Sequence, residues 1–169
     1  FARHHPSFRF YWIVEYDVDY TGNWSDFFSD FVDNHSDMLA TTVFRYDFCP
    51  NWCHWPKLKV SFLIRQANYL RTLCCIARYS NAALSCLDRA YKKGWSGHFE
   101  CLIPTTLYAN GLSIEDFGGD GEFVKPGNIN KYYFNNPGDS YCQPGSFTVS
   151  ANTFDPAAFR PLLHHPVKY

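Results

Sequence analysis

The stretch from Phe10 to Asn23 constrains the fold of this chain most strongly. Its first five residues, FYWIV, are all aromatic or β-branched, which is typical of a core β-strand. Acidic residues then follow at every second position, at Glu15, Asp17 and Asp19, before the turn-forming residues TGN. Because successive side chains of a strand point to opposite faces, we expect all three carboxylates on one face.

Three carboxylates on one face repel one another unless a cation lies among them or water solvates them. A solvated strand end that leads into a turn is the simpler interpretation. The other is a ligand site, because ligands bind at the carboxyl ends of strands in open α/β sheets. The residues alone leave both interpretations open.

The composition sets further limits. A chain of 169 residues is long enough for one domain with a real core. The net charge of −1 gives no indication of binding to nucleic acid or to an anionic membrane surface. No apolar run reaches the ~18 residues of a membrane span, so we expect no transmembrane segment. Nothing in the sequence indicates a compartment.

The seven cysteines do not define a disulfide framework. Their number is odd, so at least one is unpaired within the chain. Cys49 and Cys53 flank a loop and are spaced for a disulfide. With His54 they also resemble half of a zinc site, but the sequence offers no second closely spaced Cys/His pair.

The remaining patterns alternate between strands and helices, which favours a single α/β domain over residues 1–169. We expect a short helix at Asp155 at most, and little regular structure in residues 122–150. The other expected elements are a helix from Asn23 or Ser25 to about Asn34, a strand over Met38–Tyr46, a strand or buried helical turn over Leu70–Ala77, a helix over Asn81–Lys92 capped by Ser80, a short helix after Pro104, and a strand over Leu112–Phe117.

Three further groups of residues are candidates for chemistry. Glu100, beside His98 and Phe99, is a candidate general base, because partial burial raises the pKa of a carboxyl group. His164 and His165 near the terminus are either exposed or able to complete a metal site. The Gly-rich turn from Asp116 to Asp120 is a solvated turn or a Ca²⁺ loop, although its spacing does not match an EF-hand.

These segments, taken in order, resemble a known family. The order is WIVEYDVDYTGNW, a helix, LATTVFRY, GWSGHFECLIPTTLYANGL and the terminal HHPVK. It is similar to the metal-dependent nucleotide-sugar glycosyltransferases of the GT-A fold, and to a group of them with a "WxxEYDV…TG" block and a terminal "HPVK". The resemblance covers most of the chain from Tyr11 to Lys168.

The resemblance implies a GT-A-like mixed sheet with flanking helices and a Mn²⁺ or Mg²⁺ cofactor. An Asp-x-Asp motif at a strand end would hold the metal and the sugar nucleotide, and Asp17 belongs to both possible registers, Glu15-x-Asp17 and Asp17-x-Asp19. The C-terminal histidine ligand falls on His165, and the catalytic base of inverting members falls on Glu100. The expected partners are a nucleotide-sugar donor and a carbohydrate or other hydroxyl acceptor.

We place Trp95 and His98, with Glu15 and Asp17, among the donor-binding residues, and Trp52 and Trp55 are further candidates to stack on sugar rings. The chain has no initiator Met and begins close to the acidic strand, so we expect a partial domain that lacks the N-terminal nucleotide-binding half. Two alternatives are a non-catalytic carbohydrate-binding fragment and a glycoside hydrolase that uses Glu100 with a second carboxylate.

Overall fold

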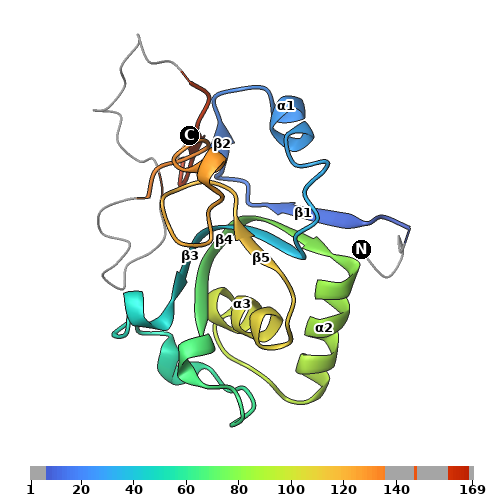
Figure 1. Ribbon diagram of the computed structural model, residues 1–169, viewed down its shortest axis with the longest axis vertical. Helices are drawn as coiled ribbons and strands as arrows, with labels where there is room; N and C mark the ends of the chain where they lie inside the picture. The colour runs from blue at the N-terminus through green and yellow to red at the C-terminus, as the bar shows by residue number, and fades with distance from the viewer. Residues whose placement is uncertain (1–6, 136–146, 148–159, 168–169) are drawn as a thin grey trace.

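A mixed four-stranded sheet forms the centre of the molecule (Figure 1). The computed structural model describes residues 7–135, 147 and 160–167. The strand order is β1 (Phe10–Val14), β4 (Leu70–Ser80), β3 (Met38–Arg45) and β5 (Ile114–Asp116). β4 runs antiparallel to both neighbours, and β5 runs parallel to β3. The chain is therefore a mixed α/β protein, as the sequence predicted.

β1 begins where the sequence predicts, but it ends at Val14 and does not continue through the acidic residues to Thr21, and it is an edge strand and not a core strand. It pairs only with β4 in this sheet, from Phe10 opposite Ser80 to Val14 opposite Ile76. Ile13 and Val14 are 54% and 40% exposed. The fully buried central strand is β4, all of whose eleven residues are buried. Aromatic and β-branched residues suit both positions, so composition alone does not separate an edge strand from a central one.

Each face of the sheet has its own cover. α2 (Asn81–Lys92) and α3 (Phe99–Ala109) lie together on one face, against Met38, Ala40 and Ala77 (Figure 1). The other face carries an aromatic cluster in which Phe27 of α1 (Trp24–Ser29) packs against Phe117 and Trp12. α1, the short strand β2 (Asp19–Tyr20) and its partner β6 (Leu163–His164) gather at one end of the molecule.

The helices agree with the sequence signals at some ends and differ at others. α2 has the predicted bounds, and the Ser80 hydroxyl caps it by accepting from the Ala83 amide at 3.0 Å. Asn23 caps α1 as expected, but α1 ends at Ser29 and a turn replaces the rest of the predicted helix. α3 begins five residues before Pro104 and contains it, so the prediction that this helix follows Pro104 is wrong.

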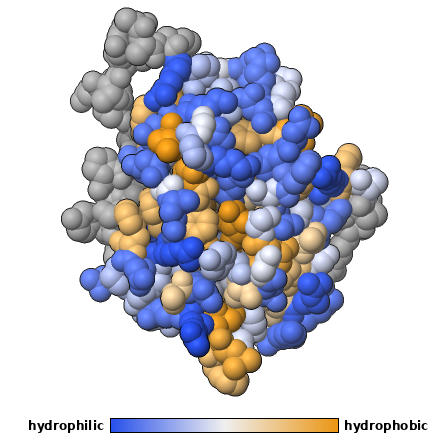
Figure 2. All heavy atoms as spheres, in the orientation of Figure 1, coloured by the Kyte–Doolittle hydropathy of each residue, from blue (hydrophilic) through white to orange (hydrophobic). Residues whose placement is uncertain are grey.

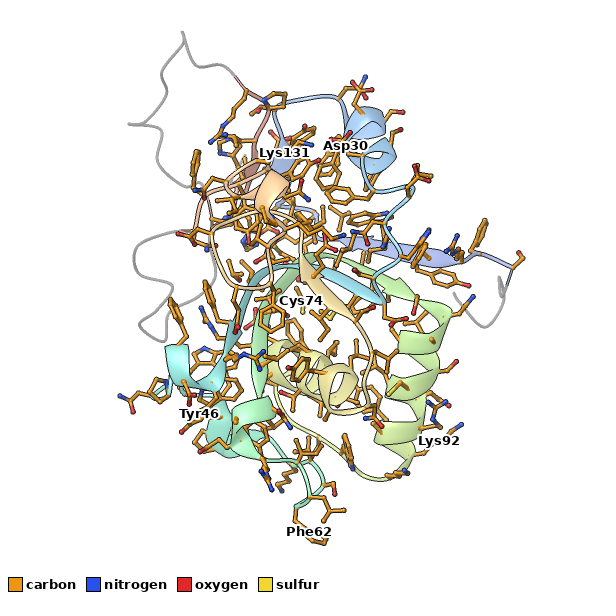
Figure 3. The ribbon with its side chains drawn as sticks, viewed as in Figure 1. Asp30, Tyr46, Phe62, Cys74, Lys92 and Lys131 are labelled. Atoms are coloured by element: carbon orange, nitrogen blue, oxygen red, sulfur yellow. The ribbon has the colours of Figure 1, made fainter. Side chains whose placement is uncertain are left out.

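A buried arginine of β4 holds the turn that follows α1. The Arg78 guanidinium donates to the carbonyls of Phe31, Asn34 and Ser36 at 2.8–3.2 Å, and it lies 3.9 Å from the centre of the Phe10 ring. It thereby satisfies the carbonyls that α1 and its following turn leave open. At the surface, Asp30 and Lys131 form an ion pair at 3.1 Å (Figure 3).

Cys49 and Cys53 do not form the predicted disulfide. Cys49 is buried and Cys53 is exposed, and none of the six cysteines that the structure describes forms a disulfide. Cys142 and the helix expected at Asp155 lie outside the described residues. Within the described ranges, no helix is long and apolar enough to cross a membrane.

Candidate metal centre and its neighbouring carboxylate

The acidic segment after β1 is a tight turn and not a continued strand. The Glu15 amide still donates to the Cys75 carbonyl of β4 at 2.7 Å, and the Val18 amide then donates back to the Glu15 carbonyl at 3.2 Å. β2 pairs with β6, with Asp19 opposite His164. This pairing brings the C-terminal segment of the chain against the acidic turn, where the Val167 amide donates to the Asp17 carbonyl at 2.9 Å.

Glu15, Asp17 and His165 converge at this turn. The His165 Nε2 atom lies 3.7 Å from Glu15 Oε2 and 3.6 Å from Asp17 Oδ1. The three side chains offer ligand atoms that all lie within 4.8 Å of one another. The His165 side chain is 9% exposed, that of Asp17 23% and that of Glu15 46%. The group is therefore anchored on its histidine side and open to solvent on its glutamate side.

The geometry of this group fits a divalent cation. The two histidine–carboxylate distances exceed normal hydrogen-bond lengths. Ligands of an octahedral Mg²⁺ at 2.0–2.1 Å are about 3 Å apart when adjacent and about 4 Å apart when opposite, and the two observed distances fall between these values, so small side-chain shifts would complete the site. The Asp17 Oδ1 atom is also buried without a hydrogen-bond partner, which a bound cation would supply.

Asp19 does not belong to this group. Its Oδ1 atom accepts from the backbone amide of Tyr20 at 2.9 Å, at the start of β2. The turn over Glu15–Val18 interrupts the alternation of a strand, and therefore the three acids do not share one face. Of the two registers that the sequence left open, the structure brings together Glu15-x-Asp17 with His165, and it separates Asp19 from them.

Glu100 lies in the first turn of α3 and is buried. Burial raises the pKa of its carboxyl group to about 7, the positive charge of Arg71 opposes this rise, and the negative charge of Glu15 adds to it. Glu100 and Glu15 are therefore close enough to influence each other.

His98 precedes α3 and lies against Glu100. Its Nδ1 atom is 3.5 Å from Glu100 Oε2, and its ring stacks on that of His54 with 3.8 Å between the centres. Burial lowers the pKa of both imidazoles, and the nearby Lys57 charge lowers them further. Both shifts favour the neutral form of the ring. The sequence suggested His54 only as part of a zinc half-site, and its contact with His98 comes from the tertiary structure.

Two of the three tryptophans suggested for sugar stacking do not have a free ring face. Trp52 and Trp55 are 1% and 7% exposed, and they form a small core with Cys49 and Cys101. Their apolar rings are used to attach the segment after β3 to the start of α3. Trp95 follows α2 and is half-buried.

The Asp116 carboxylate, the candidate for a Ca²⁺ loop, is used within the protein. It accepts from the amides of Val43 and Gly118 at 3.0 Å and from the Tyr133 hydroxyl at 2.7 Å. Complete burial raises its pKa to about 7. The Tyr133 oxygen accepts from the Thr42 amide, and Thr42 has a positive φ of 50° in the irregular part of β3. This network stabilises a bend in the sheet, which favours a structural role.

Arg71 is the residue of this region that sequence analysis passed over. It is 1% exposed on β4, with its guanidinium 5.5 Å from the Trp52 ring and 5.6 Å from the Phe44 ring. Its charge acts on Glu100. A signal was present, because a charged residue in an otherwise apolar strand must be compensated when the strand is buried.

Comparisons with protein-family models, with curated proteins and with solved structures find no match to this chain. The grounds for assigning a function are therefore the residues of this site and their geometry.

Proposed function

We propose that this chain is a metal-dependent glycosyltransferase with a GT-A-like fold, which transfers a sugar from a nucleotide-sugar donor to a hydroxyl acceptor. The observation that carries the proposal is the convergence of Glu15, Asp17 and His165 on one cation-sized space. The buried carboxyl group of Glu100, close enough to sense the charge of Glu15, supports it. The order of motifs in the sequence adds the resemblance to this enzyme class.

Glu15, Asp17 and His165 would hold the divalent cation. A bound cation of this kind neutralises the negative charge that develops on a departing diphosphate. Two carboxylate oxygens and one imidazole nitrogen favour Mn²⁺ over Mg²⁺, since Mg²⁺ prefers oxygen ligands and water. The open side of the group, at the half-exposed Glu15, leaves room for donor phosphates to approach.

Glu100 would remove the proton from the acceptor hydroxyl. A general base works best when its pKa lies close to the working pH, and burial brings the pKa of Glu100 to about 7. Arg71 keeps part of the carboxylate ionised by its positive charge. The His98 ring lies beside it, with Nδ1 3.5 Å from the carboxylate, and burial lowers the pKa of that ring.

Calorimetric titration of Mn²⁺ into the whole chain, with and without uridine or guanosine diphosphate, tests this proposal. We expect binding of Mn²⁺ that tightens when the nucleotide is present. Asp17→Asn should weaken the binding of Mn²⁺ at least tenfold. Asp19→Asn is the matched control, because it removes an equal charge two residues away from an acid outside the group, and it should leave the affinity within about twofold.

The proposal fails if the folded protein binds no Mn²⁺. It also fails if Asp17→Asn and Asp19→Asn lower the affinity for Mn²⁺ equally. An equal loss of affinity would mean that the cation is attracted by the total negative charge of the turn and is not bound by Asp17 in particular. Binding of Mn²⁺ without any effect of the nucleotide, and without turnover of nucleotide sugars, would favour a non-catalytic carbohydrate-binding protein. The burial of Trp52 and Trp55 removes two of the ring surfaces that such a protein would use.

A glycoside hydrolase is the second candidate. The raised pKa of Glu100 and the proximity of the Glu15 charge resemble the paired carboxylates of that reaction, in which one acid is protonated and the other ionised. This chemistry needs no metal. Hydrolysis of an aryl glycoside that persists in a chelator and is lost in Glu100→Gln would therefore support the hydrolase and argue against the transferase.

A further inference from the structure

The loop over residues 57–65, KLKVSFLIR, has an apolar tip at one end of the molecule. Phe62 and Leu63 are adjacent, and they are 93% and 76% exposed. Phe62 lies at the lower extremity in Figure 3, and the same extremity is strongly hydrophobic in Figure 2 while most of the surrounding surface is hydrophilic. Single exposed apolar residues are ordinary, but two large neighbours at a projecting tip indicate a contact surface.

The tip is held by local structure. The Ile64 amide donates to the Ser61 carbonyl at 3.0 Å, and the Leu63 amide donates to the Ser61 hydroxyl at 3.3 Å. At the base of the loop, Lys59 and Ser96 exchange backbone hydrogen bonds at 2.7 and 2.9 Å. A hydrogen-bonded turn on a braced stem thus presents Phe62 and Leu63 to the outside.

Positive charges surround this tip. Lys57, Lys59 and Arg65 are exposed on the loop itself. The pairing of Lys59 with Ser96 also brings the exposed C-terminal end of α2 close, with Lys92 and Lys93. Lys92 forms an ion pair with Asp88 at 2.6 Å. The sequence contains no Asp or Glu between Asp47 and Asp88, so the loop itself carries only basic charges.

We propose that this basic loop docks on the surface of an anionic lipid bilayer. Phe62 and Leu63 would enter the boundary between headgroups and acyl chains, while Lys57, Lys59 and Arg65 would contact the lipid phosphates and carboxylates. An apolar tip inside a ring of lysine and arginine is the chemistry that such an interface recognises. The net charge of −1 gives no sign of this basic loop, because the acidic residues of the rest of the chain balance its lysines and arginine in the total.

Charge complementarity favours a lipid surface over an apolar protein partner. Each basic residue near an anionic membrane surface contributes about 1 kcal/mol, which corresponds to about a fivefold change in affinity. Replacing the three basic residues of the loop should therefore weaken binding about a hundredfold. The inference does not depend on the proposed transferase activity, since none of the three residues belongs to the metal group.

Flotation of the whole chain with vesicles of phosphatidylcholine, with and without 30% phosphatidylserine, tests the proposal. We expect flotation with the phosphatidylserine vesicles only, and its loss at high salt. The Lys57→Gln, Lys59→Gln, Arg65→Gln variant and the Phe62→Ser, Leu63→Ser variant should each stay in the soluble fraction. All of these positions are exposed, so the variants should remain folded.

Two controls remove similar groups from the opposite end of the molecule. Val32→Ser removes a 70% exposed apolar side chain that follows α1, and Lys131→Gln removes a charge at the end opposite Phe62 (Figure 3). Neither should change flotation. Absence of the parent protein from the phosphatidylserine vesicles would overturn the proposal, as would equal losses in the controls. A concentration-dependent dimer that Phe62→Ser abolishes, without vesicle binding, would assign the tip to a second copy of the chain instead.

Discussion

Replacing Glu100 by Gln should stabilise the protein above neutral pH. Gln resembles the protonated carboxyl group in shape and carries no charge. The pKa of Glu100 rises from 4.5 to about 7 mainly because burial penalises the ionised form. The folded state therefore holds a proton at pH values where the unfolded chain has released it, and the free energy of unfolding falls as the pH rises from 4.5 to 7.

The size of this effect follows from the shift. At 1.36 kcal/mol for each pKa unit, the raised pKa of Glu100 lowers the free energy of unfolding by about 1 kcal/mol at pH 5 and by about 3 kcal/mol at pH 8. These values are relative to the protein with a protonated or uncharged group at this position. The side chain is 11% exposed, so water screens little of this cost. Glu100→Gln should accordingly gain about 3 kcal/mol relative to the parent protein at pH 8 and little below pH 4.5.

Urea denaturation monitored by tryptophan fluorescence, at pH 5 and pH 8, measures this difference. The comparison must be made between the variant and the parent at each pH, because burial also raises the pKa of Asp116 to about 7 and that group titrates in both proteins. Glu122→Gln is the matched control. Its side chain is 52% exposed, so its replacement should change stability by less than about 0.5 kcal/mol.

A Glu100→Gln protein with the same stability difference from the parent at pH 5 and pH 8 would refute the reasoning. It would mean that Glu100 titrates close to its ordinary pKa, through closer contact with Arg71 or with water. The same result would remove the physical reason for assigning Glu100 as a base that works near neutral pH. If turnover of a nucleotide sugar is found, its rate should rise with pH around pH 7, and Glu100→Gln should abolish that dependence.

Three further variants test the buried polar contacts through the urea midpoint. Arg78→Met should cost about 3 kcal/mol, because it leaves the buried carbonyls after α1 without their donors. Tyr133→Phe should cost about 2 kcal/mol, because Asp116 loses its hydroxyl donor. Ser80→Ala should cost about 1 kcal/mol through loss of the α2 cap.

Exposed positions provide the controls for these variants. Arg65→Met and Tyr16→Phe remove the same chemical groups, at an exposed arginine and at a tyrosine that is 96% exposed. Each should change stability by less than about 0.5 kcal/mol. Comparable losses at buried and exposed positions would mean that the buried networks contribute nothing specific.

Local sequence determined several elements of this fold. The FYWIV run forms β1, although the strand stops before the acidic residues, and the Ser80 cap with the apolar positions that follow sets α2 from Asn81 to Lys92. These signals are local, since a cap or an alternating pattern acts within a few residues of itself. The sequence also identified Asp17, Glu100 and His165 as candidates, from residue type and resemblance.

Tertiary packing decided where the local signals were weak or divided. Pro104 indicated a helix start, yet α3 begins at Phe99, because its buried residues pack against β4 on both sides of the proline. The strand at Leu70, which the sequence left open as a strand or a helical turn, is the central strand β4. A buried strand has no polar face, and therefore its pattern cannot be told from that of a buried helix.

Only the tertiary structure decided the composition of the candidate metal group. Glu15 and Asp17 lie near one end of the chain and His165 near the other, and the pairing of β2 with β6 brings them together. Asp19 has the same residue type and the same spacing, but the turn at Glu15–Val18 directs it elsewhere. Residue type and spacing therefore determined which side chains are candidates to bind a cation. Which of these candidates lie together depends on backbone hydrogen bonds between segments far apart in the sequence.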